Sequence, residues 1–237
     1  MRFDRRISLP GFTGPKLNIM TRTYHELQEL NPDCGRSTGV DSLTSIRHTL
    51  RALASESGPR DALDKVRLLR PLVTKARDIL RKRFESGDSP EANLRHRARF
   101  ADSIVIGLLH IASISKGIRD GSMVAPLAAI AVGAYGRREL TSSSELDLLF
   151  LIPESSSSFA GNVAPATREC IGAVVASLWD LGFEPNHATR SVKECLELAQ
   201  DDQTVLDHLV DRRHLWGCYG LFAALDTELG TLRRSPG

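Results

Sequence analysis

The chain has 237 residues, of which 41% are hydrophobic and 25% are charged. That is enough apolar material to fill the core of one large domain or two small ones, and it is typical of an ordinary soluble globular protein. Because 31 Lys and Arg residues face 29 Asp and Glu residues, the net charge of +2 gives no bulk electrostatic reason to expect a nucleic acid or membrane partner.

The four cysteines are spread along the chain without a C-x-x-C pair, at Cys34, Cys170, Cys195 and Cys218. This spacing favours reduced thiols over a zinc site or a disulfide framework. The basic N-terminus lacks an apolar core of signal-peptide length, and no run approaches the roughly 18 apolar residues of a membrane span. We therefore expect a cytoplasmic protein.

The first part of the chain is expected to be helical behind a poorly ordered arm. Residues 1–40 carry scattered Pro and Gly with little periodicity. Apolar spacing then predicts helices over residues 41–57 and 61–84, and Pro71 should bend or split the second one because proline lacks the amide hydrogen. A further helix should start at Pro90.

The character of the sequence changes at about residue 125. The runs LAAIAVGA at 127–134 and LDLLFLI at 146–152 are each typical of a strand buried on both faces. An amphipathic helix should follow over 166–181, and a weaker strand over 183–192. The rest of the chain is expected to be helical.

These elements predict an α+β fold with three parts. A poorly ordered arm over residues 1–40 is followed by a helical lead over 41–120, and the core with its helical tail covers 121–237. Trp179 and Trp216 lie in helical apolar stripes and are expected in the core.

Two carboxylates stand at the start of the second predicted strand. Glu145 and Asp147 are two residues apart, so in an extended chain their side chains point to the same face. Two neighbouring acids repel each other unless a proton or cation intervenes, and paired oxygen ligands at a strand end suit Mg²⁺. A bound magnesium ion would in turn attract a phosphate.

The residues before this pair fit a phosphate ligand. Gly133 lets the backbone approach closely, and a short helical turn from Tyr135 to Leu140 would aim amides at phosphate oxygens. Arg137 and Arg138 add positive charge. Glycines near a strand end are also common in ordinary turns, and an E-x-D pair can be solvated charge, so spacing alone leaves both interpretations open.

Two blocks of the sequence resemble the bacterial PII uridylyltransferases. AVGAYGRRELTSSSELDLLFL at 131–151 is similar to the nucleotidyltransferase motif of that family, which reads G-G-Y-G-R-G-E-L, a short loop and S-D-x-D before an apolar strand. LWDLGFEPNHATRSVKECLELAQDDQTVLDHLVDRRHLWG at 178–217 resembles the family segment that follows, with its L-W-D-x-G, H-x-x-R-[ST] and E-C-x-x-x-A. The resemblance covers roughly residues 60–230.

The resemblance implies a polymerase-beta-like nucleotidyltransferase fold with a small mixed sheet. It also implies Mg²⁺-dependent transfer of UMP from UTP, or from another nucleoside triphosphate, to a tyrosine of a PII-type signalling protein in nitrogen regulation. Glu145 and Asp147 would be the catalytic metal ligands. The residues expected around the triphosphate are Gly133, Ala134, Gly136, Arg137, Ser144 and Arg190. His187, in the H-x-x-R motif, is as well explained as a hydrogen-bonded structural histidine.

The chain departs from the family pattern at three positions: Ala134, Arg138 and Glu145. The third departure matters most, because Glu is one methylene longer than Asp and displaces its carboxylate by on the order of 1 Å, which can cost ~10²-fold in rate. A catalytically impaired, nucleotide-binding or regulatory relative is therefore the alternative. Glu184 is the nearest candidate for a third carboxylate.

The family enzymes continue into a phosphohydrolase domain marked by a His-Asp doublet and then into sensing domains. No His-Asp doublet occurs in this sequence. We therefore expect uridylyl removal and glutamine sensing to be missing, and the chain to be a standalone transferase-like protein or a fragment. The acceptor, the base preference and the oligomeric state cannot be read from the sequence.

Overall fold

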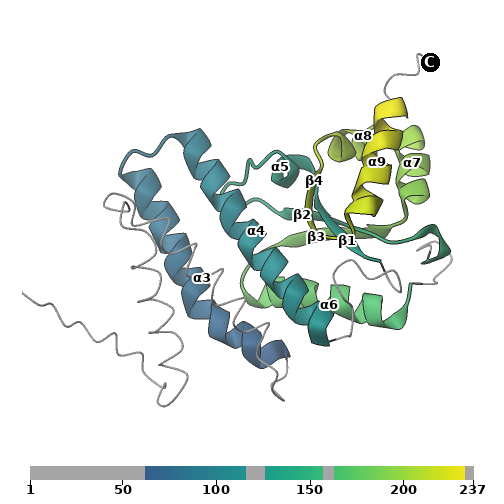
Figure 1. Ribbon diagram of the computed structural model, residues 1–237. Coiled ribbons are helices and arrows are strands. Elements are labelled where there is room, and N and C mark those ends of the chain that lie inside the picture. The colour runs from purple at the N-terminus through teal and green to yellow at the C-terminus, as the bar shows by residue number, and fades with distance from the viewer. Residues whose placement is uncertain (1–61, 116–125, 157–162, 233–237) are drawn as a thin grey trace, which may run out of the picture.

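The structure is a computed structural model that describes residues 62–115, 126–156 and 163–232. The arm predicted over 1–40 and the helix predicted over 41–57 lie outside the described residues. Within them, helices cover both faces of a small sheet (Figure 1). The α+β class predicted from the sequence is confirmed.

Two long antiparallel helices form the described part of the helical lead. Helix α3 spans Ala62–Glu85 and α4 spans Pro90–Ser115. Pro71 was expected to bend or split the helix over residues 61–84; the split is wrong, because α3 runs through this exposed proline as one element, and the bend stays a prediction. Pro71 lies in the first half of α3. The apolar residues Leu69 and Val73, on either side of it in the sequence, are buried, and this burial stabilises the helix across the proline.

The sheet has four strands in the order β3-β2-β1-β4. They span Ala128–Ala131 (β1), Leu146–Leu151 (β2), Pro185–Arg190 (β3) and Arg213–Gly217 (β4). Strand β1 is antiparallel to β2 and β4, whereas β2 and β3 are parallel, so the sheet is mixed as expected.

Strand β4 corrects the prediction of a purely helical tail. It has five residues, Arg213–Gly217, and only Leu215 and Trp216 among them are buried hydrophobics. Such a short strand carries too few residues to show a period of two, and its pairing with β1 lies more than 80 positions back in the chain. Trp216 is therefore in the core, as expected, but on a strand.

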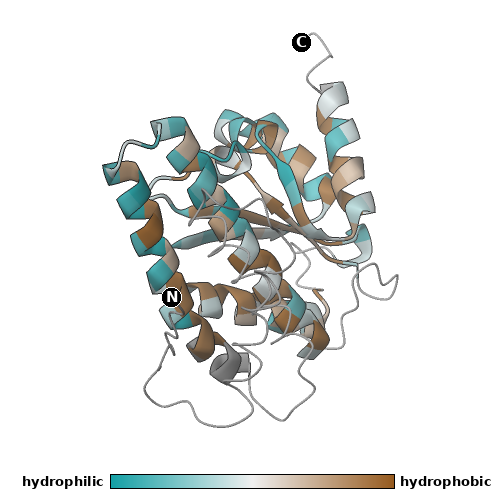
Figure 2. Ribbon diagram, turned by 60° about the vertical axis from the view of Figure 1, so that its left-hand side comes forward, coloured by the Kyte–Doolittle hydropathy of each residue, from teal (hydrophilic) through white to brown (hydrophobic). Residues whose placement is uncertain are grey.

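The two faces of the sheet are covered by different helices. Alternate residues of β2 divide between them: Leu148 and Phe150 join the core with α3, α4 and α6 (Pro165–Asp180), whereas Leu149 and Leu151 join the core on the other face. Figure 2 shows apolar and polar residues alternating along these helices. The central strands thus read as continuous apolar runs because both faces are buried.

The second face is covered by three helices of the C-terminal part. These are α7 (Val192–Asp201), α8 (Gln203–Val210) and α9 (Tyr219–Leu232). Helix α7 begins with a capping box, in which the Ser191 hydroxyl accepts from the Glu194 amide and the Glu194 carboxylate accepts from the Ser191 amide. Two short elements complete the described chain, namely α5 (Gly133–Gly136) and a 3-10 turn (Glu154–Ser156).

Two apolar features differ from a simple core assignment. Trp179, predicted to be buried, is 56% exposed because it falls on the outer side of α6. Helix α4 is long and apolar enough to cross a membrane by length and composition, but 72% of its most apolar window is buried inside the protein. It lies between α3 and α6, in the core that these helices form with one face of the sheet.

Candidate active site

The site is built around the tight turn that follows β1. Gly133 opens this turn with a φ of +57°, a left-handed conformation that favours glycine. The helical turn begins at Gly133 and ends at Gly136, so it starts two residues earlier than predicted. The backbone amides of Gly136 and Arg137 bond back to Val132 and Gly133, which closes the turn.

Gly136 is needed for a different reason. A Cβ atom at this position would overlap the Asp211 carbonyl oxygen, which belongs to the segment between α8 and β4. The turn and this segment therefore touch through their backbones. Any larger residue at position 136 would push apart two elements that carry site residues.

Asp147 lies directly beside the turn. Its carboxylate Oδ1 accepts a hydrogen bond from Asn186 Nδ2 at 3.0 Å, and its backbone carbonyl accepts from the Val132 amide at 3.1 Å. A Cβ atom placed on Gly133 would be 3.3 Å from Asp147 Oδ2. The absence of a side chain at Gly133 thus lets the turn approach the carboxylate oxygen that Asn186 does not engage.

His208, on α8, also lies against the Gly133 turn. Its Cδ2 atom would be 2.9 Å from a Cβ on Gly133, and its Nδ1 is 3.0 Å from the Thr204 carbonyl oxygen. That contact favours the tautomer with a proton on Nδ1 and leaves Nε2 as an acceptor. Sequence reasoning did not single out His208, although it falls inside the second block that resembles the uridylyltransferases.

The first acid is less well held than the second. Glu145 is exposed and precedes β2 by one residue, whereas Asp147 is half-buried. Glu184 is also exposed, and its backbone carbonyl accepts from the Leu146 amide at 2.8 Å, so the two glutamates stand where the parallel strands β2 and β3 begin. The predicted acids therefore lie where strands β2 and β3 begin, at one end of this strand pair.

Arg137 is held in ion pairs across the turn. Its guanidinium bonds Glu139 at 2.8 Å and Asp211 at 2.6 Å, and these two carboxylates raise its pKa above the usual range. Both ion pairs are at the surface, so they orient the Arg137 side chain but contribute little to the stability of the fold. Ala134 lies within the turn, half-buried, between the two glycines.

Arg138 explains one departure from the family pattern. It has a φ of +63°, and among the described residues it is the non-glycine with a left-handed backbone. The family motif has glycine at this place, and only glycine adopts this conformation without steric cost. The chain thus keeps the turn geometry with a side chain that strains it.

Ser144 lies in the loop before β2, and Arg190 lies at the far end of β3 from Asp147. The Ser144 hydroxyl accepts from the Thr141 amide at 2.9 Å and closes the loop before β2. Arg190 pairs with Leu151 at the far end of β2, four residues from the Asp147–Asn186 pair, which is about 13 Å along the strand. His187 is exposed and packs edge-on against Phe150 at a ring distance of 6.3 Å.

A buried clamp supports the turn from behind. Arg213, on β4, forms two hydrogen bonds with the Asp102 carboxylate of α4, at 2.9 and 3.0 Å. The same guanidinium donates to the carbonyls of Tyr135, at 3.1 Å, and Gly136, at 3.3 Å. Burial, with the nearby Asp102, raises the pKa of Tyr135 well above its usual value. The carbonyl side of the turn is thus fixed to both α4 and β4.

Comparison with known proteins finds relatives of this chain among curated enzymes. No protein-family model matches the chain. Curated relatives do: the bifunctional uridylyltransferase/uridylyl-removing enzyme of Methylococcus capsulatus is 33% identical over 170 residues, which are 71% of this chain and 18% of that protein. The same enzyme of Novosphingobium aromaticivorans is 30% identical over 195 residues, or 81% of this chain and 21% of the relative.

Over most of its length this chain is similar to the bacterial bifunctional uridylyltransferase/uridylyl-removing enzymes. A third match, the enzyme of Rhodospirillum rubrum, is 28% identical over 192 residues and 80% of the chain. The chain spans about a fifth of the length of these uridylyltransferase/uridylyl-removing enzymes. The first of the two sequence blocks that carry the resemblance contains Gly133 and Asp147. The second contains Asn186 on β3 and His208 on α8. The fold brings these four residues together.

Proposed function

We propose that this chain is an Mg²⁺-dependent nucleotidyltransferase that transfers UMP from UTP to a tyrosine of a PII-type protein in the cytoplasm. The relationship to uridylyltransferases supports a nucleotidyltransferase-like activity. The observation that carries the proposal is the close approach of the Gly133 backbone to the Asp147 carboxylate and the His208 ring. A Cβ atom at position 133 would lie 3.3 Å from Asp147 Oδ2 and 2.9 Å from His208 Cδ2.

The donor atoms at this edge fit magnesium better than a softer metal. Asp147 offers one carboxylate oxygen that Asn186 does not engage, and Glu145 offers a second, exposed carboxylate. Among the described residues no group of three or more His, Cys, Asp and Glu side chains is placed to enclose a metal ion. Mg²⁺ needs no such cage, because it is bound by one or two carboxylates and completes its octahedron with waters and substrate phosphates.

When bound, the metal would neutralise the charge that develops on the leaving pyrophosphate. The chain's own residues would do the positioning. The Gly133 turn lets phosphate oxygens approach the backbone, and Asn186 orients the Asp147 carboxylate. His208 Nε2 is a second acceptor beside the Gly133 turn, after Asp147 Oδ2, so it is suited to take a hydrogen bond from the acceptor hydroxyl or from a metal-bound water.

A transfer assay tests this proposal. The chain is incubated with labelled UTP, Mg²⁺ and a PII protein, and label on the PII tyrosine is measured. We expect Asp147→Asn to lower the rate by ~10²-fold or more, because the amide removes the charge that holds the cation. Asp201→Asn, the same change at an exposed position of α7, should leave the rate unchanged. Equal rates for the two variants would contradict the proposal.

A second candidate function is nucleotide binding without transfer. The exposed Glu145, with one more methylene than aspartate, favours it. Isothermal titration with UTP and Mg²⁺ separates the two. Saturable UTP binding without transfer to PII or other acceptors, using all four labelled triphosphates, would replace the enzyme assignment with a regulatory one. Transfer from a triphosphate other than UTP would change the donor and keep the chemistry.

A further inference from the structure

A pocket lies beside the loop that leads into the candidate active site. It has a volume of about 80 Å³ and is bounded by α3, α4, the loop 140–146 and the segment before β3. Two arginines line it, Arg77 from α3 and Arg97 from α4. Neither belongs to the Gly133–Asp147–His208 site.

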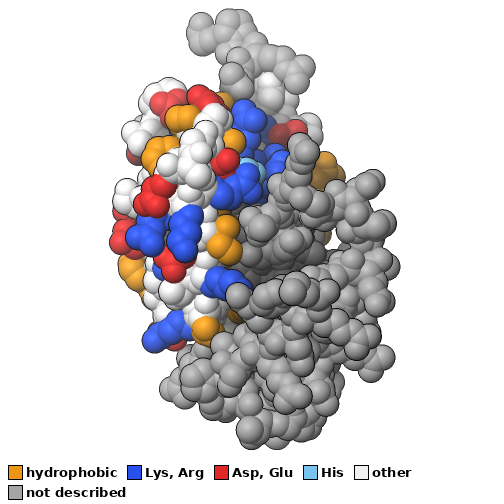
Figure 3. Space-filling view, turned by 90° about the vertical axis from the view of Figure 1, so that its left-hand side faces the viewer, with side chains coloured by type: hydrophobic (Ala, Val, Ile, Leu, Met, Phe, Trp, Pro, Cys, Tyr) orange, Lys and Arg blue, Asp and Glu red, His pale blue; other side chains and the backbone are white. Residues whose placement is uncertain are grey.

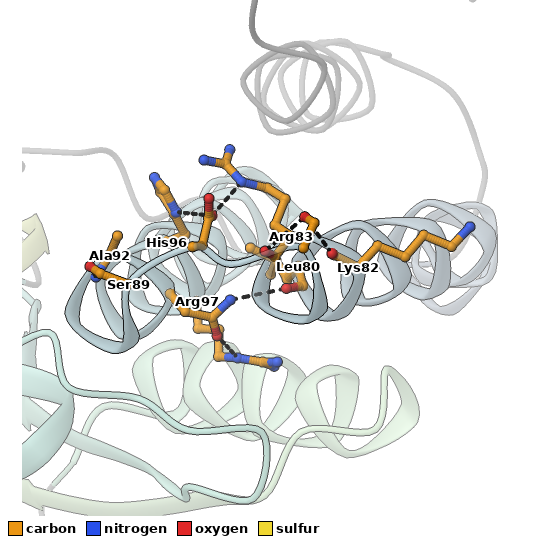
Figure 4. A network of polar contacts seen from close by, with 10 residues as sticks. Leu80, Lys82, Arg83, Ser89, Ala92, His96 and Arg97 are labelled. Atoms are coloured by element: carbon orange, nitrogen blue, oxygen red, sulfur yellow. Dashed lines mark hydrogen bonds and ion pairs between the residues drawn. The ribbon is translucent and has the colours of Figure 1, made fainter.

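Both guanidiniums are held in place by uncharged partners. Arg77 donates to the Gly182 carbonyl at 2.6 Å and stacks on the Phe183 ring at 4.6 Å. Arg97 donates through Nε to the Asn93 carbonyl oxygen at 2.8 Å. Asn93 is itself fixed, because its amide donates to the Leu80 carbonyl at 3.0 Å (Figure 4). The two cations are thus oriented without being neutralised.

No carboxylate among the described residues forms an ion pair with either arginine. Two neighbouring arginines differ in this respect, because Arg81 pairs with Asp78 and Arg83 with Asp88. Figure 3, which faces the α3 side, shows Lys and Arg side chains lying among Asp and Glu on its coloured part. Burial and Arg97 lower the pKa of Arg77, and burial lowers that of Arg97, as expected for two half-buried like charges.

The rest of the wall suits oxygen ligands. Loop residues 141–144 read Thr-Ser-Ser-Ser, so four hydroxyl-bearing side chains line the pocket opposite the arginines. Hydroxyls can donate or accept, whereas guanidiniums only donate. A tetrahedral oxyanion uses many donors at once, and Arg binds such groups through two parallel N–H bonds.

We propose that this pocket binds a phosphate-class oxyanion, either free phosphate or the phosphoryl group of a small phosphate monoester. The volume is several times that of one water, so an anion of this size fits. The bound charge would offset the repulsion between Arg77 and Arg97. Glu184 lies at the same pocket and is exposed, so its charge would oppose the anion weakly.

The pocket is joined to the active site by a short stretch of chain. Leu140 to Ser144 line it, and the same loop then carries Glu145 and enters β2 at Leu146. An anion bonded to the loop hydroxyls would restrict this loop and the acid it carries. The binding itself does not depend on transferase activity, so the two proposals fail separately.

Titration with inorganic phosphate, followed by amide NMR and by calorimetry, tests the site. We expect saturable binding with a Kd on the order of 1 mM or below, with the largest shifts at Thr141–Ser144 and Gly182. Arg97→Gln should weaken binding by ~10-fold or more, whereas Arg81→Gln, on α3 and paired with Asp78, should not. Glycerol phosphate, run as a second arm, distinguishes a monoester site from one for the free ion.

Two further variants complete the test. Asp147→Asn should leave phosphate binding unchanged, and shifts centred on Gly133 and His208 would instead assign the anion to the active site. Glu184→Gln should tighten binding by roughly 2-fold. If Arg97→Gln does not fold, a Glu184→Gln variant with unchanged affinity overturns the proposal, as does the absence of saturation at on the order of 10 mM phosphate in the wild type.

Discussion

The buried clamp between Asp102, Arg213 and the α5 turn makes a strong prediction for stability. The two side chains are 12% and 18% exposed, and Arg213 makes four hydrogen bonds, two to the carboxylate and two to the carbonyls of Tyr135 and Gly136. Arg213→Met keeps an unbranched apolar stem but leaves the carboxylate buried without its cation. Removing one partner of a buried pair costs about 3–5 kcal/mol.

Chemical denaturation measures this cost. We expect the free energy of unfolding of Arg213→Met to fall by about 3–5 kcal/mol, and that of Asp102→Asn/Arg213→Met to recover part of the loss, because the double variant buries no isolated charge. Arg81→Met is the control, since both side chains of its ion pair with Asp78 are more than half exposed. A loss below about 1 kcal/mol for Arg213→Met would refute the argument that this clamp fixes the turn.

Four other predictions follow from single positions. Gly133→Ala should cost on the order of 1 kcal/mol in the free energy of unfolding but ~10²-fold in transfer rate, because its methyl group fills the space beside Asp147; equal effects on both would contradict this. Arg138→Gly should raise the unfolding free energy by about 0.5–1 kcal/mol by relieving the left-handed backbone, and a destabilised variant would contradict it. Asp202 has a pKa lowered by its capping bond to the Thr204 amide, so its contribution to stability is present above its ordinary pKa of about 4 and is lost as the pH falls through its lower folded pKa. Urea midpoints of the wild type should therefore drop more steeply below about pH 4 than those of Asp202→Ala. Burial raises the pKa of the Cys195 thiol to about 12. Iodoacetamide at neutral pH should therefore modify Cys195 only after denaturant is added, as detected by mass spectrometry, and labelling of Cys195 in the native protein would refute this.

The sequence predicted those parts of the molecule that are local. The runs at 127–134 and 146–152 became β1 and β2 because both are continuous apolar segments, which burial on two faces requires. Asp147 and the Gly133 turn were found together because only a short loop separates them. The helical lead followed from a period of 3.6 over more than 20 residues of α3 and α4.

What the sequence did not predict depends on distant pairs. Strand β4 exists only through its pairing with β1, and Arg213 meets Asp102 across 111 positions of the chain. His208 reaches the site because α8 packs beside α5, and nothing in its own helix marks it. Gly136 reads as an ordinary turn glycine until the Asp211 carbonyl is placed against it.

The strand order also has a consequence for how the protein is made. Strand β4 and Arg213 come after residue 210, yet they complete the sheet beside β1 and hold the carbonyls of the Gly133 turn. During synthesis on the ribosome, some 80 residues must therefore be added after the turn before Arg213 and β4 can bind to it. Until then one edge of β1 has no neighbouring strand. A nascent chain stalled ahead of Arg213 should thus be a better client for chaperones than one stalled after Gly217.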